Sequence, residues 1–135
     1  MNLELSNEQY WLVATILMTS LLWVPYILNR MHEQGIFNAI WDPQGHTETK
    51  RDWARRMMQA HENAVENLVI FAPLVILVQV TGLNSEVTAS ACMLYFFTRL
   101  VHYLAFTFAV PVVRVVTFLI GFGVQLILAL TLLGL

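Results

Sequence analysis

The chain has 135 residues, of which 58% are apolar and only 12% are charged, and its net charge is −2. A soluble domain carries about 25% charged residues, so this composition excludes an ordinary soluble protein and predicts a surface that faces lipid. The basic residues form neither an excess nor a patch, which excludes a typical nucleic-acid-binding protein. The single cysteine, Cys92, excludes an intrachain disulfide and is interpreted as an inert core thiol.

Four apolar segments predict an all-α integral membrane protein, because a helix needs roughly 20 apolar residues to cross a bilayer core. The spans are expected at about residues 8–29, 52–80, 87–108 and 112–134 of a single domain, 1–135. Ser6 or Asn7 fits the start of the first span, and Pro25 predicts a kink in it. Only a few residues join the last two spans, so these are expected to be antiparallel neighbours in a four-helix bundle.

The basic residues indicate how the chain is oriented in the membrane. The loop of residues 30–51 and the start of the second span hold five of the seven, namely Arg30, Lys50, Arg51, Arg55 and Arg56. The positive-inside rule therefore places this loop in the cytoplasm and both chain ends on the other side, in the inner membrane if the protein is bacterial. An acidic N-terminus before a full-length first span predicts no cleavable signal peptide.

Ionisable residues within the spans point to function, because each is costly in lipid unless it is paired. The second span carries a polar group of Gln59, His61, Glu62, Asn63, Glu66 and Asn67, and the third carries Arg99, His102 and Tyr103. Arg99 is expected well below the membrane surface and needs an anion, for which Glu66 is the carboxylate available on a neighbouring helix. This pair has two interpretations: it locks the helices together, or it belongs to a binding site.

Arg114 favours the binding site. It is expected at the cytoplasmic start of the fourth span, at the same depth as Arg30, Arg55 and Arg56. These residues predict a cationic, amide-rich cleft that opens sideways to lipid and suits a small polyanionic molecule meeting a lipophilic one. The alternative is that the surface arginines only set the topology. No metal-ligand, phosphate-loop, dinucleotide or serine-nucleophile pattern is present in the sequence.

Three separated motifs carry a resemblance to a known family. They are Gln59–Asn67 followed by Leu-Val-Ile-Phe, then Arg99-Leu-Val-His102, and finally Pro111–Phe118. They resemble the span-two, span-three and span-four signatures of the MAPEG superfamily, the membrane-associated proteins of eicosanoid and glutathione metabolism, and the chain is similar to its bacterial-type members. The resemblance covers nearly the whole chain, and the motifs are in register with the four predicted spans.

The resemblance implies a homotrimer that binds glutathione between subunits near the cytoplasmic face. It implies transferase or peroxidase chemistry on lipophilic electrophiles or hydroperoxides that reach the site from the bilayer. The implied glutathione-binding residues are Arg30, Gln59, Glu62, Asn63, Glu66, Arg99, His102, Arg114 and Phe118. Arg114 is the implied catalytic residue, because a guanidinium beside the glutathione thiol favours the thiolate, which is the nucleophile.

The chain departs from the family pattern at four positions. Gln59 stands where many active members have an arginine, and Val115 stands where a serine or alanine is common. Phe106 and Phe118 stand where tyrosine is frequent, so each lacks a hydroxyl. Two alternatives to an enzyme therefore stay open. One is a scaffold in which the predicted ion pair of the second and third spans is structural, and the other is a protein whose cleft binds lipid or another thiol.

Overall fold

The computed structural model describes residues 3–43, 45 and 48–135. Within these residues the chain is helical and contains no strand. Its elements are α1 (Asn7–Leu21), α2 (Val24–Gln34), α3 (Ile36–Ile40), α4 (Asp52–Thr81), α5 (Glu86–Thr107) and α6 (Pro111–Leu133).

Four helical stretches are long and apolar enough to cross a membrane. They are Asn7–Gln34, Asp52–Thr81, Glu86–Thr107 and Pro111–Leu133. A helix rises by about 1.5 Å per residue, so even the shortest of these reaches about 33 Å, slightly more than the roughly 30 Å of a bilayer core. The structure therefore confirms the prediction of an all-α membrane protein with four spanning helices.

The helix ends follow from a few residues with clear local roles. Ser6 caps α1, since its hydroxyl accepts a hydrogen bond from the backbone N–H of Gln9, whose side chain accepts one from Ser6 in return. Ser85 and Thr88 form the same box at the start of α5. Gly82 ends α4 in the left-handed conformation with φ of 70°, which costs glycine little because it has no Cβ.

The first span differs from the single helix over residues 8–29 that the apolar pattern predicts. It continues to Gln34 and is divided into α1 and α2 by a turn at Leu22 and Trp23. Pro25, in the first turn of α2, lacks the N–H that a continuous helix needs, so the predicted kink is a break. The hydroxyl of Tyr103 donates to the carbonyl of Leu22, within this turn, at 2.8 Å.

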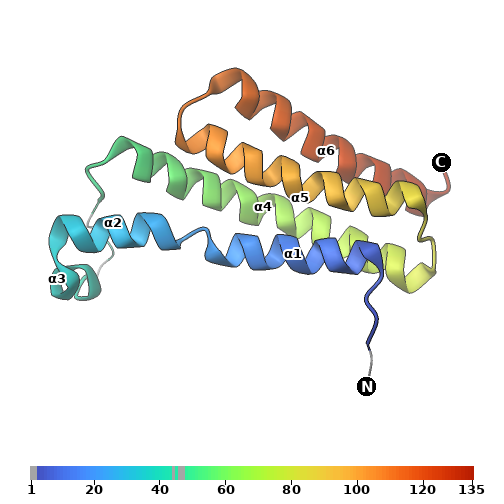
Figure 1. The fold of residues 1–135 in the computed structure, drawn as a ribbon, viewed down its shortest axis with the longest axis horizontal. Coiled ribbons are helices and arrows are strands. Elements are labelled where there is room, and N and C mark those ends of the chain that lie inside the picture. The colour runs from blue at the N-terminus through green and yellow to red at the C-terminus, as the bar shows by residue number, and fades with distance from the viewer. Residues whose placement is uncertain (1–2, 44, 46–47) are drawn as a thin grey trace.

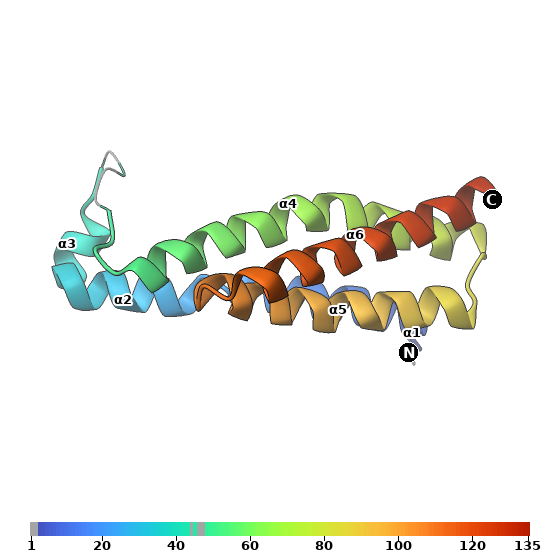
Figure 2. The ribbon, with the colours of Figure 1, turned by 90° about the horizontal axis from the view of Figure 1, so that it is seen from above.

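The helices form an elongated bundle with different features at its two ends (Figures 1 and 2). The α5–α6 hairpin packs on α4, and α1 packs between α4 and α5. Both chain termini lie at one end, and α3 with the loop before α4 lies at the other (Figure 1). Between the ends lies an apolar core of Leu12, Phe71, Val75, Val78, Ala91, Cys92, Tyr95, Val124 and Leu128.

Candidate functional site

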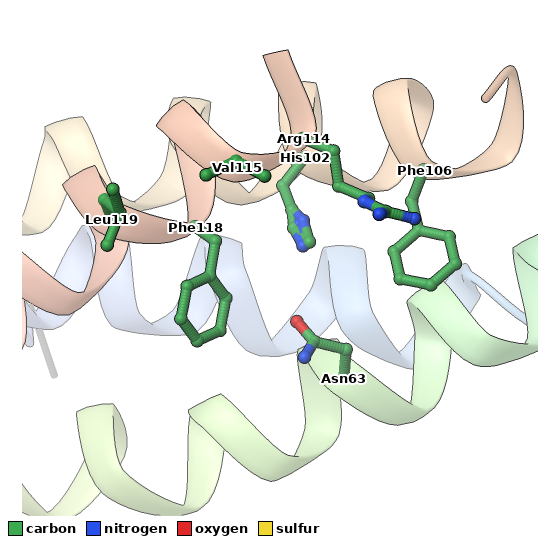
Figure 3. Close-up of a pocket in the computed structure, with 7 residues that line it drawn as sticks. All are labelled: Asn63, His102, Phe106, Arg114, Val115, Phe118 and Leu119. Carbon is green, nitrogen blue, oxygen red and sulfur yellow. The ribbon is translucent and has the colours of Figure 1, made fainter. Parts of the chain in front are cut away.

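A pocket of about 190 Å³ opens between α4 and the α5–α6 hairpin. It is lined by Asn63, His102, Phe106, Arg114, Val115, Phe118 and Leu119. Figure 3 shows His102 and Phe118 pointing from α5 and α6 toward Asn63 on α4. No lining residue is acidic, so the pocket combines apolar walls with one fixed positive charge, that of Arg114.

Local geometry brings the two sides of this pocket together. On α5, His102 and Phe106 are four residues apart and therefore share a helix face. The chain then reverses through Ala109, whose positive φ of 57° closes the turn, and α6 begins at Pro111. The turn places Arg114 in the first turn of α6, directly beside the end of α5.

Aromatic contacts hold the side chain of Arg114. Its guanidinium carbon lies 5.0 Å from the centre of the Phe106 ring, within range of a cation–π interaction. The His102 ring stacks near Phe106, with centroids 5.9 Å apart and an angle of 21° between the planes. Phe118 meets the same imidazole edge-on at 6.1 Å. The guanidinium thus has a preferred position although none of these rings carries a hydroxyl.

The predicted ion pair between Glu66 and Arg99 is wrong. Arg99 is buried, with 3% of its surface exposed, and its Nη2 donates to Oδ1 of Asn63 at 2.6 Å. Glu66 lies about 60° around α4 from Asn63, because three residues turn a helix by about 300°. This offset puts Glu66 on an exposed face. The neutral amide of Asn63 takes the place of the expected carboxylate.

Polar atoms around this pocket have unused hydrogen-bonding capacity. His102 is only 2% exposed, and neither of its ring nitrogens has a partner among the described residues. Nε of Arg99, which is bound to Asn63 through Nη2, likewise has no partner among these residues. Buried polar atoms are normally satisfied, so these atoms mark a place where a ligand or water completes the arrangement. Deeper in the bundle, the polar side chain of Gln125 does have a partner, because its Nε2 donates to the carbonyl of Asn67 at 3.2 Å.

A second pocket, of about 390 Å³, lies on the other side of α4 and faces α2. It is lined by Tyr26, His61, Glu62, Val65 and Glu66. The Tyr26 hydroxyl and Nδ1 of His61 are 2.7 Å apart and share a hydrogen bond. The sequence motif contains His61, but only the structure shows that Tyr26 from the first span joins it.

A third pocket, of about 370 Å³, lies where the loop meets α2 and α4. Its described lining residues include Arg30, Gln59 and Glu62 from the predicted set. The returning chain beside it is fixed by Glu33, whose carboxylate accepts hydrogen bonds from the backbone N–H groups of Lys50 and Arg51 at 3.1 and 3.2 Å. Arg56, also on α4, is not among the described lining residues of this pocket. Its Nε donates to the carbonyl of Thr107 at 2.8 Å and so satisfies a backbone carbonyl at the end of α5.

The comparison with protein families identifies the fold. The model of the MAPEG family matches residues 9–134. The chain belongs to the MAPEG family. No curated protein and no solved structure matches it. MAPEG is a membrane family that includes glutathione transferases and peroxidases as well as non-catalytic members, so membership supports the membrane fold and leaves the activity to be argued from the site.

In this MAPEG chain the predicted site residues divide between two sides of α4. Asn63, Arg99, His102, Arg114 and Phe118 gather at the pocket beneath the α5–α6 hairpin or, for Arg99, directly behind it. Arg30, Gln59, Glu62 and Glu66 line the two pockets that face α2 and the loop. One chain therefore brings together two halves of the predicted set but not the whole.

Three of the four departures from the MAPEG pattern meet in one place. Phe106, Val115 and Phe118 all line the pocket that contains Arg114. Gln59 lies apart from them, beside Arg30. The pocket around Arg114 is therefore less polar than the family pattern implies, while its positive charge is kept.

Proposed function

We propose that this MAPEG protein is a glutathione-dependent transferase or peroxidase that acts on lipophilic electrophiles or hydroperoxides by attack of the glutathione thiolate. One observation carries the proposal: Arg114 is held over Phe106 in a pocket with no acidic residue in its described lining, next to His102 nitrogens that have no partner in the described part of the chain. A cation fixed in apolar surroundings attracts an anion more strongly than one in water. The anion that suits this chemistry is a thiolate.

Arg114 would act by stabilising that thiolate. A thiol with an ordinary pKa of about 8.5 is only a few per cent ionised at neutral pH, and lowering the pKa by two units makes it mostly ionised. In transferase chemistry the sulfur then forms a bond to the electrophilic carbon, while a leaving group departs with its bonding electron pair or a double bond opens and takes up a proton. In peroxidase chemistry it attacks one oxygen of the O–O bond, forming a sulfenic acid and releasing an alcohol once the other oxygen takes a proton. A second glutathione thiol then attacks the sulfenic sulfur, which forms the disulfide and releases water.

The division of the site residues supports a glutathione site between subunits. That these subunits form a homotrimer is implied by the family resemblance. The pocket at Arg114 measures about 190 Å³, whereas small-molecule sites span roughly 300–1,000 Å³. A tripeptide therefore needs further surface. The pockets with Arg30, Gln59 and Glu66 on the far side of α4 would supply it from a neighbouring subunit. In that arrangement Arg30 meets a glutathione carboxylate, and Asn63 and His102 position the peptide.

The same proposal places the loop in the cytoplasm and both termini across the membrane. Four spans require the two termini to share a side, and they do lie at one end of the bundle (Figure 1). The basic residues concentrated at the opposite end support a cytoplasmic location for that end. If the protein is bacterial, the membrane is the inner one.

The test is glutathione binding to the detergent-purified protein, measured by calorimetry. We expect the wild type to bind and Arg114→Ala to bind more weakly. Arg51→Ala is the matched control, since it removes an exposed arginine from the loop. Absence of binding by the wild type at millimolar glutathione would contradict the proposal, as would equal binding by the two variants.

A second candidate function is favoured by the lining of the pocket. Phe106, Val115 and Phe118 provide no hydroxyl to assist a reaction. The alternative is therefore a non-catalytic MAPEG protein whose cleft binds a lipid or a thiol other than glutathione. Its distinguishing result is co-purified lipid, or binding of another thiol, that depends on Arg114 in a protein without turnover.

A further inference from the structure

The loop between the first two spans carries an exposed apolar surface on α3. Ile36, Phe37 and Ile40 of this short helix are 59%, 89% and 69% exposed, and Trp41, which ends it, is 81% exposed. Large apolar side chains with this exposure are unexpected in the most polar part of the chain. A contiguous group of them indicates contact with something other than water.

These four side chains share one face of the helix. At about 100° per residue they fall within an arc of about 140°, the arrangement of an amphipathic helix. Ala39 lies outside that arc and is half-buried. Asn38 also lies outside it, and its side chain donates to the carbonyl of Gln34 at 3.0 Å. The apolar face is therefore directed away from the protein.

The position of α3 places this face at the membrane surface. The span Asn7–Gln34 has 28 residues, which corresponds to about 42 Å of helix, whereas the bilayer measures about 30 Å across its core and about 40–45 Å with its headgroups. The end of α2 thus reaches the headgroup layer. Gly35, with φ of 80°, turns the chain there, and α3 packs beside the last turns of α2 (Figures 1 and 2).

The surroundings of α3 match the same layer. Exposed apolar side chains also precede α3 in the first span, since Trp23, in the turn before α2, and Leu28 of α2 are 45% and 58% exposed. The end of α2, the loop and the start of α4 lie at this end of the bundle (Figure 1). They carry the basic residues Arg30, Lys50, Arg51 and Arg55. Exposed apolar side chains thus occur on both α2 and α3, and the nearby basic residues complement anionic headgroups.

We propose that α3 and Trp41 lie in the interfacial layer of the bilayer that the four spans cross, with the apolar face against the acyl chains. Ile36, Phe37, Ile40 and Trp41 then form an anchor that ties the loop to the membrane. The anchor lies between Glu33 and Thr49, whose side chains are joined by a hydrogen bond. It would therefore keep the loop beside the pocket lined by Arg30 and Gln59. The proposal does not depend on glutathione chemistry.

The experiment uses the full chain in vesicles of phosphatidylcholine and phosphatidylglycerol. A variant with Trp11, Trp23 and Trp53 replaced by phenylalanine leaves Trp41 as its only tryptophan. We expect Trp41 emission to be quenched by lipids brominated near the headgroup end of their chains and protected from acrylamide in the water. Adding Phe37→Ser and Ile40→Ser should abolish the lipid quenching, whereas Asn38→Ser, on the other side of α3, should leave it unchanged.

Two results would overturn the proposal. Quenching by acrylamide without quenching by brominated lipid would mean that α3 stands in water. Protection from both quenchers would mean that protein covers the face, as a second copy of the chain would. Circular dichroism of each variant shows whether the four spans are intact, so that loss of quenching reports on α3 and not on unfolding.

Discussion

The two ends of the bundle differ in whether their buried polar side chains have hydrogen-bond partners. At the end with the termini, Glu8 is 3% exposed but accepts a hydrogen bond from the Thr88 hydroxyl at 2.5 Å, and Ser6 donates to Gln79 at 2.7 Å. Toward the loop end, His102 is as deeply buried and has no partner for either nitrogen among the described residues. Satisfied polar groups fix a structure, whereas unsatisfied ones leave capacity for a ligand.

This comparison predicts that mutations at the two ends separate activity from stability. Changes at Arg114 and His102 themselves should affect function and leave the bundle folded. Changes at Glu8 should weaken the bundle and leave the chemistry of the remaining folded protein intact.

The largest expected effect is that of Arg114→Ala on turnover. If the guanidinium stabilises the thiolate, its loss should lower kcat/KM for glutathione conjugation or peroxide reduction by about 10²–10³-fold, as removal of a single electrostatic stabiliser does. The thermal midpoint should hardly change, because Arg114 is only half-buried and forms no ion pair with the described residues. A variant that loses its fold along with its activity would show that Arg114 is structural.

Asn63→Leu should give the next largest effect, on stability. It removes the oxygen that accepts from Arg99, and hydrogen bonds to charged groups contribute about 1.5–3 kcal/mol. Glu66→Gln should change the free energy of unfolding by no more than about 0.5 kcal/mol, as exposed substitutions do. Chemical unfolding of the two variants without ligand compares them directly. A larger loss of unfolding free energy for Glu66→Gln than for Asn63→Leu would indicate that Glu66, and not Asn63, is the partner of Arg99.

Glu8→Ala tests the opposite end of the bundle. It leaves the Thr88 hydroxyl without its carboxylate partner, at a cost of about 1–3 kcal/mol. The exposed Glu4→Ala is the control. We expect a lower unfolding midpoint for Glu8→Ala only, with unchanged turnover per folded molecule. Loss of turnover at full stability would mean that the two ends are coupled, and the contrast between them would not hold.

Much of the fold could be predicted from sequence because its determinants are local. Apolar length marks the four spans, Ser6 caps the first, and Pro25 interrupts it. The extension of α2 through Arg30 to Gln34 could not be predicted in this way, since hydropathy ends at the first charge while the helix does not. The hydrogen bond that the Leu22 carbonyl accepts at this break could not be predicted either, because its donor, Tyr103, is 81 residues away in the sequence.

The candidate site was predictable as a group of residue types but not as a geometry. The spacing of polar residues on α4 is compatible with either Asn63 or Glu66 facing Arg99, and only the rotation of α4 in the packed bundle decides for Asn63. The same rotation separates Glu66 from the pocket at Arg114. Pairing between helices depends on such rotations, which the pattern of one sequence does not specify.

The smallest predicted effect concerns the ring that holds Arg114. Phe106→Leu keeps an apolar side chain but removes the ring face that lies 5.0 Å from the guanidinium. A cation–π contact contributes about 0.5–2 kcal/mol, so kcat/KM should fall by about 2- to 30-fold. Phe106→Tyr should preserve the rate, because it keeps the ring.

The two Phe106 variants should also differ in their pH profiles. With Arg114 less well placed, the bound thiol ionises less readily, so the rise in rate should move to higher pH for Phe106→Leu only. Equal profiles for leucine and tyrosine would show that the backbone of α6, rather than Phe106, positions the guanidinium. The unsatisfied end of the bundle would then be preorganised by its helices alone.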